Sequence, residues 1–408
     1  MVHASQARSS SFVPPASSAA RPSVAILGAG CIGLSIAWRL AAAGCPVDVF
    51  DRGEAGRGAT HAAGGMLAAC VETEPGEESL LPLTRASQAL WPGFARELEE
   101  ASGLPVDLRT EGTMVIALNA DDAAKIRFLH GFQRDLGLPV EWLGGAEIRR
   151  REPYLQPGVA GALFCREDHQ VDNRKVAAAL LRAARAAGAR VHERCGNPSL
   201  VVEGGRATGL RVGDVTVPAD RVVLAAGAWS GGVDGLPAAA RPPVRPVKGQ
   251  MVCLRMDARL PLLNHVVWTP GTYLIPRLDG RLLIGATTEE RGFDDRLTAG
   301  GQFALLEGAW RALPGIAELP IEESWVGFRP GSRDDAPILG ETAVEGLVHA
   351  TGHHRNGILL TPVTADGIAR LILTGETDPV MRPFAAARFA SRAGLQAEPK
   401  AAPKGAAA

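Results

Sequence analysis

The chain lacks an excess of charge of either sign. Its 408 residues include 43 Lys and Arg against 44 Asp and Glu, which gives a formal net charge of −1. A nucleic-acid-binding protein usually carries a basic stripe or a basic excess, and the sequence has neither. With 46% apolar and 21% charged residues, it also differs from disordered and fibrous chains. The composition therefore favours a folded protein that does not bind nucleic acid, and the length suits two domains.

Cysteine and tyrosine are both scarce. The six cysteines are scattered without a CxxC pair, and the only tyrosines are Tyr154 and Tyr273. Several cysteines lie in apolar runs, where a free cysteine behaves as a small hydrophobic residue. We therefore expect reduced thiols in a reducing, cytoplasmic compartment, with neither a disulfide framework nor a metal site.

Long hydrophobic runs are also lacking. The longest run, 24–38, is interrupted by three glycines and is too short to cross a bilayer, so no membrane span is expected. Residues 1–22 are rich in Ser, Ala and Pro and contain no acidic residue. Organelle transit peptides share that composition with disordered tails, and we interpret the segment as a disordered tail. A second tail is expected over 385–408, where Ala, Pro and Lys dominate.

Glycine, by contrast, is abundant, with 48 residues, and three of them form the pattern Gly28-x-Gly30-x-x-Gly33. The pattern follows a short apolar segment typical of a buried parallel strand and opens a helical pattern over 34–43. Such a turn lets the backbone approach a pyrophosphate, which the helix N-terminus then stabilises. Asp51, 23 positions after Gly28, is placed to bind ribose hydroxyls. The pattern predicts a dinucleotide site without choosing between FAD and NAD, and Arg52 is also compatible with the phosphate of NADP.

A loop of small residues, 57–67, follows the second predicted strand and can lie along a flat ring. With this loop the chain resembles the D-amino-acid oxidase superfamily of FAD-dependent oxidoreductases, and the glycine oxidases within it most closely, from about residue 24 to 384. The resemblance implies FAD as the cofactor. It also rests on the glycine pattern and on VVLAAGAWS (222–230), PVKG (246–249), YLIPR (273–277), GFRPG (327–331) and GHHRNGIL (352–359).

The order of the predicted elements, together with the resemblance, implies an α/β fold with two interleaved domains. Nucleotide-binding elements lie at both ends and in the middle of the chain, with strand-rich segments between them. The resulting division assigns a Rossmann-like FAD-binding domain to 23–104, 166–245 and 326–384, and an α+β substrate domain built on an antiparallel sheet to 105–165 and 246–325.

The resemblance implies oxidation of an amine next to a carboxylate. A hydride would leave the substrate Cα for flavin N5, and O2 would reoxidise the flavin and give hydrogen peroxide. Glycine, small amines and small D-amino acids are the implied substrates, and the imine of glycine would supply the thiazole of thiamine. In such chemistry the protein supplies orientation and charge, and no strong base is required.

Three residues match catalytic and substrate-binding positions of the family. Arg329 would anchor the substrate carboxylate through two parallel hydrogen bonds, Tyr273 would project its hydroxyl into the pocket, and Arg355 would close the pocket. Each has a plainer interpretation. Arg329 suits a solvated surface, Tyr273 suits a core position with a satisfied hydroxyl, and Arg355 suits an ion pair with a distant acid.

The cofactor contacts implied by the family fall mainly in the glycine pattern, the end of the second strand, the small-residue loop and the loop 353–359. A helix beginning near Gly357 would stabilise negative charge on the reduced flavin if its N-terminus points at the ring. His353 and His354 are adjacent and would point apart, so no metal is expected there. The contacts are Gly28, Gly30, Cys31, Ile32, Gly33, Asp51, Arg52, Ala59, Thr60, Gly64, Gly65, Met66, Ser199, His353, His354, Arg355, Asn356, Gly357, Ile358 and Leu359.

Several alternatives stay open at this point. Gly271 and Thr288 replace a histidine and a methionine found in some relatives, which leaves the substrate size undecided. His61 lies in the loop where dimethylglycine dehydrogenases hold flavin covalently. A dehydrogenase that passes its electrons to a quinone or a carrier protein is one alternative to an oxidase. A flavin-binding assembly module without turnover is another, and Arg329 and Tyr273 disfavour it. Family members are often tetramers, so a homotetramer is expected by resemblance alone.

Overall fold

The computed structural model of the chain describes residues 21–389. The expected tails 1–22 and 385–408 lie almost entirely outside these residues. The described part of the second tail is folded, since Ala386–Phe389 forms a 3-10 turn. Arg388 in this turn donates from Nε to Asp334 at 2.8 Å. The folded chain therefore continues to Phe389.

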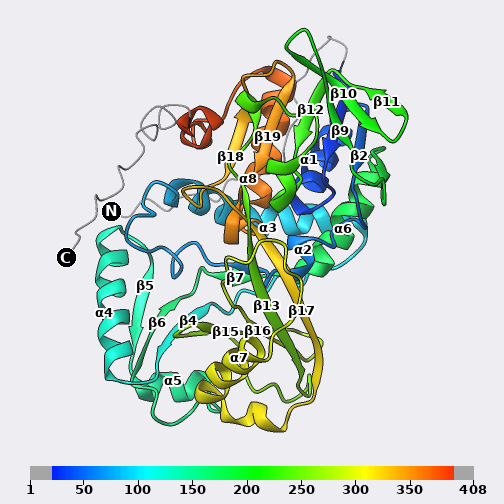
Figure 1. The fold of residues 1–408 in the computed structure, drawn as a ribbon. Coiled ribbons are helices and arrows are strands. Elements are labelled where there is room, and N and C mark those ends of the chain that lie inside the picture. Colours follow the sequence, from blue (N-terminus) through cyan, green and yellow to red (C-terminus); the bar gives the residue numbers. More distant parts are fainter. Residues whose placement is uncertain (1–20, 390–408) are drawn as a thin grey trace, which may run out of the picture.

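A six-stranded, mostly parallel sheet forms the centre of one part of the molecule (Figure 1). Its neighbouring strands are parallel except for β18 and β19, which are antiparallel. β1 has a parallel neighbour on each side and is fully buried, which explains its uninterrupted apolar sequence VAIL. In spatial order the strands are β18 (Ile338–Glu341), β19 (Leu347–Thr351), β12 (Arg221–Leu224), β1 (Val24–Leu27), β2 (Val47–Phe50) and β8 (Arg190–His192).

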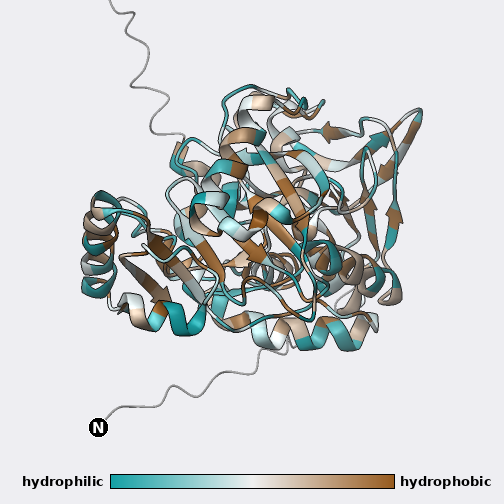
Figure 2. Cartoon of the chain, turned by 90° about the horizontal axis from the view of Figure 1, so that it is seen from below, coloured by the Kyte–Doolittle hydropathy of each residue, from teal (hydrophilic) through white to brown (hydrophobic). Residues whose placement is uncertain are grey.

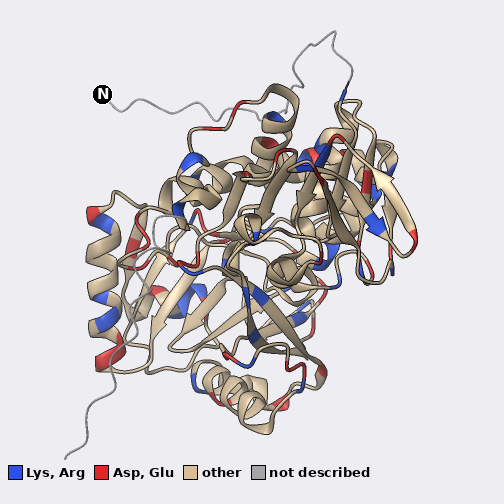
Figure 3. Cartoon of the chain, turned by 45° about the horizontal axis from the view of Figure 1, so that its top comes forward, with Lys and Arg blue, Asp and Glu red and all other residues tan. Residues whose placement is uncertain are grey.

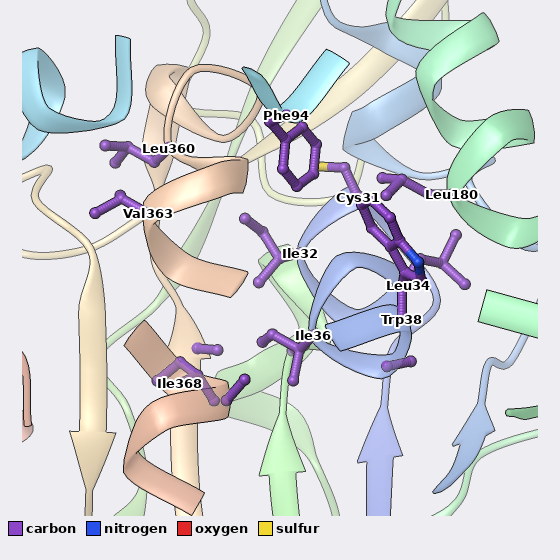
Figure 4. Close-up of a cluster of buried hydrophobic side chains, with 14 of the residues drawn as sticks. Cys31, Ile32, Leu34, Ile36, Trp38, Phe94, Leu180, Leu360, Val363 and Ile368 are labelled. Atoms are coloured by element: carbon purple, nitrogen blue, oxygen red, sulfur yellow. The ribbon is translucent and has the colours of Figure 1, made fainter. Parts of the chain in front are cut away.

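Four helices cover one face of this sheet: α1 (Cys31–Ala42), α3 (Leu81–Ser102), α6 (Asn173–Ala186) and α8 (Thr361–Thr374). Ile26 points into this layer, whereas its neighbours Ala25 and Leu27 point to the opposite face, as the period of a strand requires. The helical layer is a continuous apolar core. Figure 4 shows Cys31, Ile32, Leu34, Ile36, Trp38, Phe94, Leu180, Leu360, Val363 and Ile368 in it.

A small three-stranded antiparallel sheet covers the opposite face and was not anticipated as a layer from the sequence. Its strands are β9 (Ser199–Glu203), β10 (Arg206–Val212) and β11 (Val215–Pro218), in the order β11-β10-β9. Leu200 and Leu210 pack there against Leu27. The parallel sheet is thus buried on both sides.

The second part of the molecule is an eight-stranded sheet in which all neighbouring pairs are antiparallel except β14 with β4. α7 (Ala299–Ala312) and α5 (Gly145–Arg151) contribute to one apolar cluster on this sheet, and α4 (Ala120–Asp135) contributes to another near β5 and β6. The α/β fold with a second, largely antiparallel sheet is confirmed. The strands in order are β17 (Ile321–Gly331), β13 (Arg245–Arg255), β16 (Arg281–Gly285), β15 (Thr272–Pro276), β14 (Val266–Thr269), β4 (Thr113–Ala117), β6 (Gly161–Cys165) and β5 (Val140–Leu143).

The two parts meet where β17 packs on α2 (Ala59–Ala62). A Cβ on Gly327 of β17 would lie 2.2 Å from the Cβ of Ala62, so only glycine allows this approach. The expected domain boundary at residue 326 falls inside β17. Because β17 pairs with β13 along nearly its whole length, we propose that the substrate part ends near Gly331.

Proline lies in the first turn of two helices. α3 begins at Leu81 with Pro82 in its first turn, where proline costs nothing because an N–H there would have no partner within the helix. α8 begins at Thr361, so the prediction of a start near Gly357 is wrong; an earlier start would place Pro362 in the helix interior. The short remaining helix-like segments do not alter the two-part architecture.

Charge and hydropathy are distributed as the composition predicts. Figure 2 shows apolar strands in the interior and alternating hydrophilic and hydrophobic residues along the outer helices. Acidic and basic residues are interspersed along the same elements in Figure 3. Among the described helices, none combines the length and the apolar character needed to cross a membrane.

Candidate functional site

A cavity of about 1170 Å³ lies between the two sheets and brings most of the predicted site residues together. Tyr273, Arg329 and Arg355 line it, as do all the predicted cofactor residues except Gly33 and Ser199. Ser199 instead opens β9, where it pairs with Arg211, and its neighbours Asn197 and Pro198 face the cavity. The segments gathered here are far apart in the sequence.

One end of the cavity is built by the glycine pattern. Gly28 has a φ of +110°, and a Cβ on it would lie 2.3 Å from the carbonyl oxygen of Ala225. A Cβ on Gly33 would lie 1.9 Å from the carbonyl oxygen of Gly28, so Gly33 serves helix–strand packing and does not line the cavity. The N-cap residue of α1, Gly30, has no side chain to cap the helix, and the Cys31 N–H is accepted by Thr60 Oγ1 at 2.9 Å. The helix dipole and the other N–H groups of the first turn suit a pyrophosphate.

Asp51 organises the adjoining turn. Its Oδ2 accepts the Ala29 N–H at 2.7 Å and its Oδ1 accepts the Gly53 N–H at 2.8 Å. Asp51 also lines the cavity, and each carboxylate oxygen keeps a lone pair for a ribose hydroxyl. The glycines and Asp51 together fit the adenosine end of a dinucleotide.

Arg52 lies in an aromatic stack. Its guanidinium carbon is 4.7 Å from the ring centroid of Trp229, and Trp229 in turn stacks on Phe293 with centroids 5.0 Å apart. Phe328 meets the ring of Phe293 edge-on at 5.3 Å. This arrangement gives Arg52 a cation–π role and leaves the NADP alternative without structural support.

The loop carrying Phe293 is held down by Lys248 of the PVKG segment. The Lys248 side chain is fully buried, and its Nζ donates to the carbonyl oxygen of Arg296 at 2.7 Å. Glu289 and Asp294 lie 3.7 and 3.5 Å from the same nitrogen and balance its charge. Phe293 is therefore fixed over the cavity edge by an anchored loop.

We expect Phe293→Ala to lower the free energy of unfolding by about 1 kcal/mol, because it removes the contact with Trp229 and Phe328. The measurement is urea unfolding of the holoprotein followed by tryptophan fluorescence. Phe303→Ala is the matched control, since Phe303 on α7 is 67% exposed and should change stability by less than about 0.5 kcal/mol. Equal losses in the two variants would contradict a specific role for the stack.

The small-residue loop is shaped by two glycines and one buried arginine. A Cβ on Gly64 would lie 2.7 Å from Ile275 Cδ1, and one on Gly65 would lie 2.1 Å from the carbonyl oxygen of Val171. Arg277 donates to the carbonyl oxygens of Gly64 at 2.8 Å and Val171 at 2.6 Å. Burial lowers the pKa of Arg277 to about 10, so it stays charged at neutral pH. Arg277 thus fixes a flat, bare surface on which a ring can lie.

His61 does not face this surface. Its neighbours Thr60 and Ala62 line the cavity, whereas His61 does not. Burial and the nearby Arg174 and Arg57 lower its pKa to about 4. The structure therefore gives no support to covalent attachment of flavin through His61.

Tyr273 and Arg329 occupy the inner part of the cavity. In β15, Leu274 packs beneath α7 while Tyr273 and Ile275 point to the opposite face, so strand alternation directs Tyr273 into the cavity. Burial raises the pKa of the Tyr273 phenol, and the nearby Arg329 partly opposes this shift. The phenol oxygen lies 3.4 Å from Met251 Sδ, a weak acceptor.

Arg329 is half-buried, and its Nη1 donates a hydrogen bond to the carbonyl oxygen of Thr287 at 3.1 Å. A Cβ on Gly249, in the facing strand β13, would lie 2.5 Å from that nitrogen. Glycine in the PVKG segment therefore leaves room for the guanidinium. The rest of its fork remains available for a carboxylate.

Arg355 is committed to two acids, as its plainer interpretation predicted. Its Nε lies 3.1 Å from Glu72 Oε2, and its Nη2 lies 2.7 Å from Glu77 Oε2. These carboxylates raise the pKa of Arg355 above its usual value, although burial opposes the shift. Arg355 borders the cavity, but its charge is already balanced within the protein.

The two histidines of the loop before α8 are neutral. Burial lowers the pKa of His353 to about 3, and its Nε2 lies 3.1 Å from Thr364 Oγ1. Burial and nearby arginines lower the pKa of His354 to about 4. Trp91 Nε1 donates to the Leu359 carbonyl oxygen at 2.9 Å, which fixes the end of the loop. The N-terminus of α8 follows directly.

A buried cluster of Cys70, Cys165 and Asp168 places three ligand-type atoms within 4.8 Å of one another. Asp168 accepts the N–H groups of Cys70 at 3.0 Å and Val71 at 2.7 Å, and Gln88 Nε2 donates to it at 2.7 Å. We assign no metal to this cluster, because its carboxylate is used to order the turn that leads to Glu72.

A family model described as FAD dependent oxidoreductase matches residues 23–371. The chain belongs to this family. The oxidoreductase is 37% identical to the glycine oxidase of Geobacillus kaustophilus over 92% of its own length and 99% of that protein. The crystal structure of glycine oxidase from the same organism superposes with a TM-score of 0.83, covering 90% of this chain and 99% of that chain at 38% identity.

A second relative of the oxidoreductase is longer than this chain. The bifunctional protein ThiO/ThiG of Trichormus variabilis is 36% identical over 91% of this chain. The chain spans 55% of that protein's length. FAD is the cofactor of the family, and the glycine turn at the α1 N-terminus, the bare Gly64–Gly65 surface and the cavity that both line fit it.

Sequence reasoning missed Glu72, Trp229, Phe293 and the anchoring role of Arg277. Glu72 lies in an acid-rich segment with Glu74, Glu77 and Glu78, and this composition is typical of a solvated loop. The available signal was that Glu72 directly follows the small, apolar run 67–71.

Proposed function

We propose that the oxidoreductase catalyses FAD-dependent oxidative deamination of glycine and small amines or D-amino acids, with O2 as the electron acceptor. One observation carries this proposal: Arg329 and Tyr273 line the same cavity as the glycine pattern and the Gly64–Gly65 loop. The glycine oxidase of Geobacillus kaustophilus, similar over nearly its whole length, supports it.

The residues of this chain would divide the work by position. Arg329 would hold the substrate carboxylate, and Tyr273 would border the substrate on the side of β15. Gly28, Gly30 and Asp51 would hold the adenosine and pyrophosphate of FAD, and Gly64, Gly65 and Met66 would lie against its ring. When bound, FAD accepts a hydride from the substrate carbon. The imine that results would then hydrolyse to an oxo acid and ammonia.

The experiment is a substrate panel on purified holoprotein. Glycine, sarcosine, D-alanine and D-proline are mixed anaerobically with the protein, and bleaching of the flavin absorption is recorded. Air is then admitted and hydrogen peroxide is measured. We expect bleaching by glycine and stoichiometric peroxide. Bleaching without peroxide would indicate a quinone or carrier acceptor, and the absence of bleaching by every compound would overturn the proposal.

Further features of the proposal rest on less direct support. All six cysteines are free, which supports a reducing, cytoplasmic compartment. The imine of glycine would supply thiazole formation for thiamine, in keeping with the ThiO/ThiG relative. A homotetramer stays a prediction from the family resemblance.

A further inference from the structure

An acidic residue, Glu72, lies in the cavity beside the proposed substrate anchors. Glu72 lines the cavity together with Tyr273, Arg329 and Arg355. Only 13% of its side chain is exposed. An isolated carboxylate with so little exposure needs a partner, because burial of a charge without one is costly.

Arg355 is that partner for one oxygen only. Glu72 Oε2 accepts the Arg355 Nε–H at 3.1 Å, and the backbone oxygen of Glu72 accepts the Nη2–H at 3.2 Å. Within residues 21–389, no side chain or backbone group donates a hydrogen bond to Oε1. One carboxylate oxygen is thus pinned, and the other is free on a residue that faces the cavity.

The turn that carries Glu72 is rigid. Asp168 accepts the N–H groups of Cys70 and Val71, directly before Glu72. Gln133 Nε2 donates to the Thr73 carbonyl oxygen at 3.0 Å on the other side. The position of the free oxygen is therefore set by the fold and does not depend on a mobile loop.

We propose that Glu72 is the group that binds the ammonium of the amino-acid substrate and takes its proton. This inference rests on the proposed function. A zwitterion has a carboxylate and an ammonium, and the cavity places a cation, Arg329, and an acid, Glu72, near the same side chain, Tyr273. Glu77 also pairs with Arg355 but does not line the cavity.

The chemistry needs no strong base, but it does need the substrate ammonium to lose a proton. The hydrogen on Cα can leave as a hydride only if the nitrogen supplies a lone pair to form the C=N bond. An ammonium has no lone pair. Glu72 Oε1 would take one proton from the ammonium and give the neutral amine. The hydride then carries both electrons of the Cα–H bond to the oxidised cofactor, and the product is a protonated imine. Reduction of O2 to hydrogen peroxide uses the two electrons and the hydrogen of the hydride, together with one further proton. Glu72 returns the proton that it took from the ammonium.

The surroundings of Glu72 poise it for this exchange. Burial raises its pKa to about 7, Arg355 opposes the shift, and the charges of Asp168 and Glu77 add to it. Tyr273 faces the same space, and the charge of Glu72 contributes to its raised pKa. Glu74 also lines the cavity, and His354 beside Arg355 stays neutral. A carboxyl with this pKa is ionised above about pH 7 and protonated below it.

The test compares Glu72→Gln with Glu77→Gln as its matched control, each as the holoprotein. The rate of anaerobic flavin bleaching by glycine is measured across a pH series. We expect a wild-type rate that rises with an apparent pKa near 7 and a Glu77→Gln profile that keeps this rise at a lower pH, because the charge of Glu77 no longer raises the pKa of Glu72. Glu72→Gln should be about 100-fold slower at neutral pH and should recover as the pH approaches the pKa of the free ammonium.

A binding measurement separates recognition of the ammonium from turnover. Acetate carries only the carboxylate, and trimethylglycine carries a permanent positive charge with no proton to give. Perturbation of the flavin spectrum reports the affinity of each. We expect Glu72→Gln to bind trimethylglycine about tenfold more weakly and acetate at least as tightly as the wild type.

Three results would overturn the role of Glu72: an unchanged pH profile in Glu72→Gln, the same loss in Glu77→Gln, or equal changes in affinity for the two ligands. If Glu72→Gln loses FAD, Glu72→Asp takes its place. This variant keeps a carboxylate, so loss of the rise in rate near pH 7 would count against the proposal. Failure of the proposed function is distinct, because the wild type itself would then not be bleached by any amine.

Discussion

Arg329→Ala is expected to lower kcat/KM for glycine about 1000-fold while the protein keeps its FAD. The half-buried guanidinium is the cation on β17 that faces the cavity opposite the glycine loop, and its removal leaves the substrate carboxylate without a charged partner. Truncating one member of a buried charge pair costs about 2–5 kcal/mol. The flavin absorption spectrum and steady-state peroxide formation provide the measurement.

Two further variants make the result specific. Arg329→Lys keeps the charge but loses the planar fork, so we expect it to recover only part of the affinity. Arg333→Ala removes an exposed arginine four positions along the chain and should leave the kinetics unchanged. An Arg329→Ala variant with wild-type KM and kcat would show that another residue anchors the carboxylate.

The sequence predicted those features that local backbone constraints decide. Gly28, Gly33, Gly64 and Gly65 are required because any Cβ there would meet another backbone or side chain, and such constraints leave a readable pattern. The position of Tyr273 was predictable for a related reason, since alternation along β15 fixes which face it takes. The two-part α/β fold followed from the order of these elements.

The partners of charged side chains were not predictable in the same way. Arg355 and Glu72 are 283 positions apart and meet only because the loops before α3 and α8 converge on the cavity. Nothing in the local sequence of Arg355 distinguishes a free cation from a paired one. The start of α8 was missed for a simpler reason, because a start near Gly357 leaves out the preference of Pro362 for the first turn of a helix.

Gly28→Ala is expected to abolish FAD retention and to lower the free energy of unfolding by about 3 kcal/mol or more. The new Cβ would lie 2.3 Å from the carbonyl oxygen of Ala225, which directly follows β12, the strand beside β1, and neither backbone can move without disturbing the sheet. The φ of +110° adds strain for any residue with a side chain. The flavin-to-protein absorbance ratio and urea unfolding of the apoprotein report the two effects separately.

Gly131→Ala shows whether such losses depend on position or on glycine replacement as such. Gly131 lies on the exposed side of α4, and a Cβ there would meet no atom within 4 Å. Alanine in a helix interior is favoured over glycine by about 0.5–1 kcal/mol, so this variant should be slightly more stable and keep its FAD. A Gly28→Ala protein that behaves like Gly131→Ala would mean that the turn can relax, and the close approach of strand and cofactor would lose its main support.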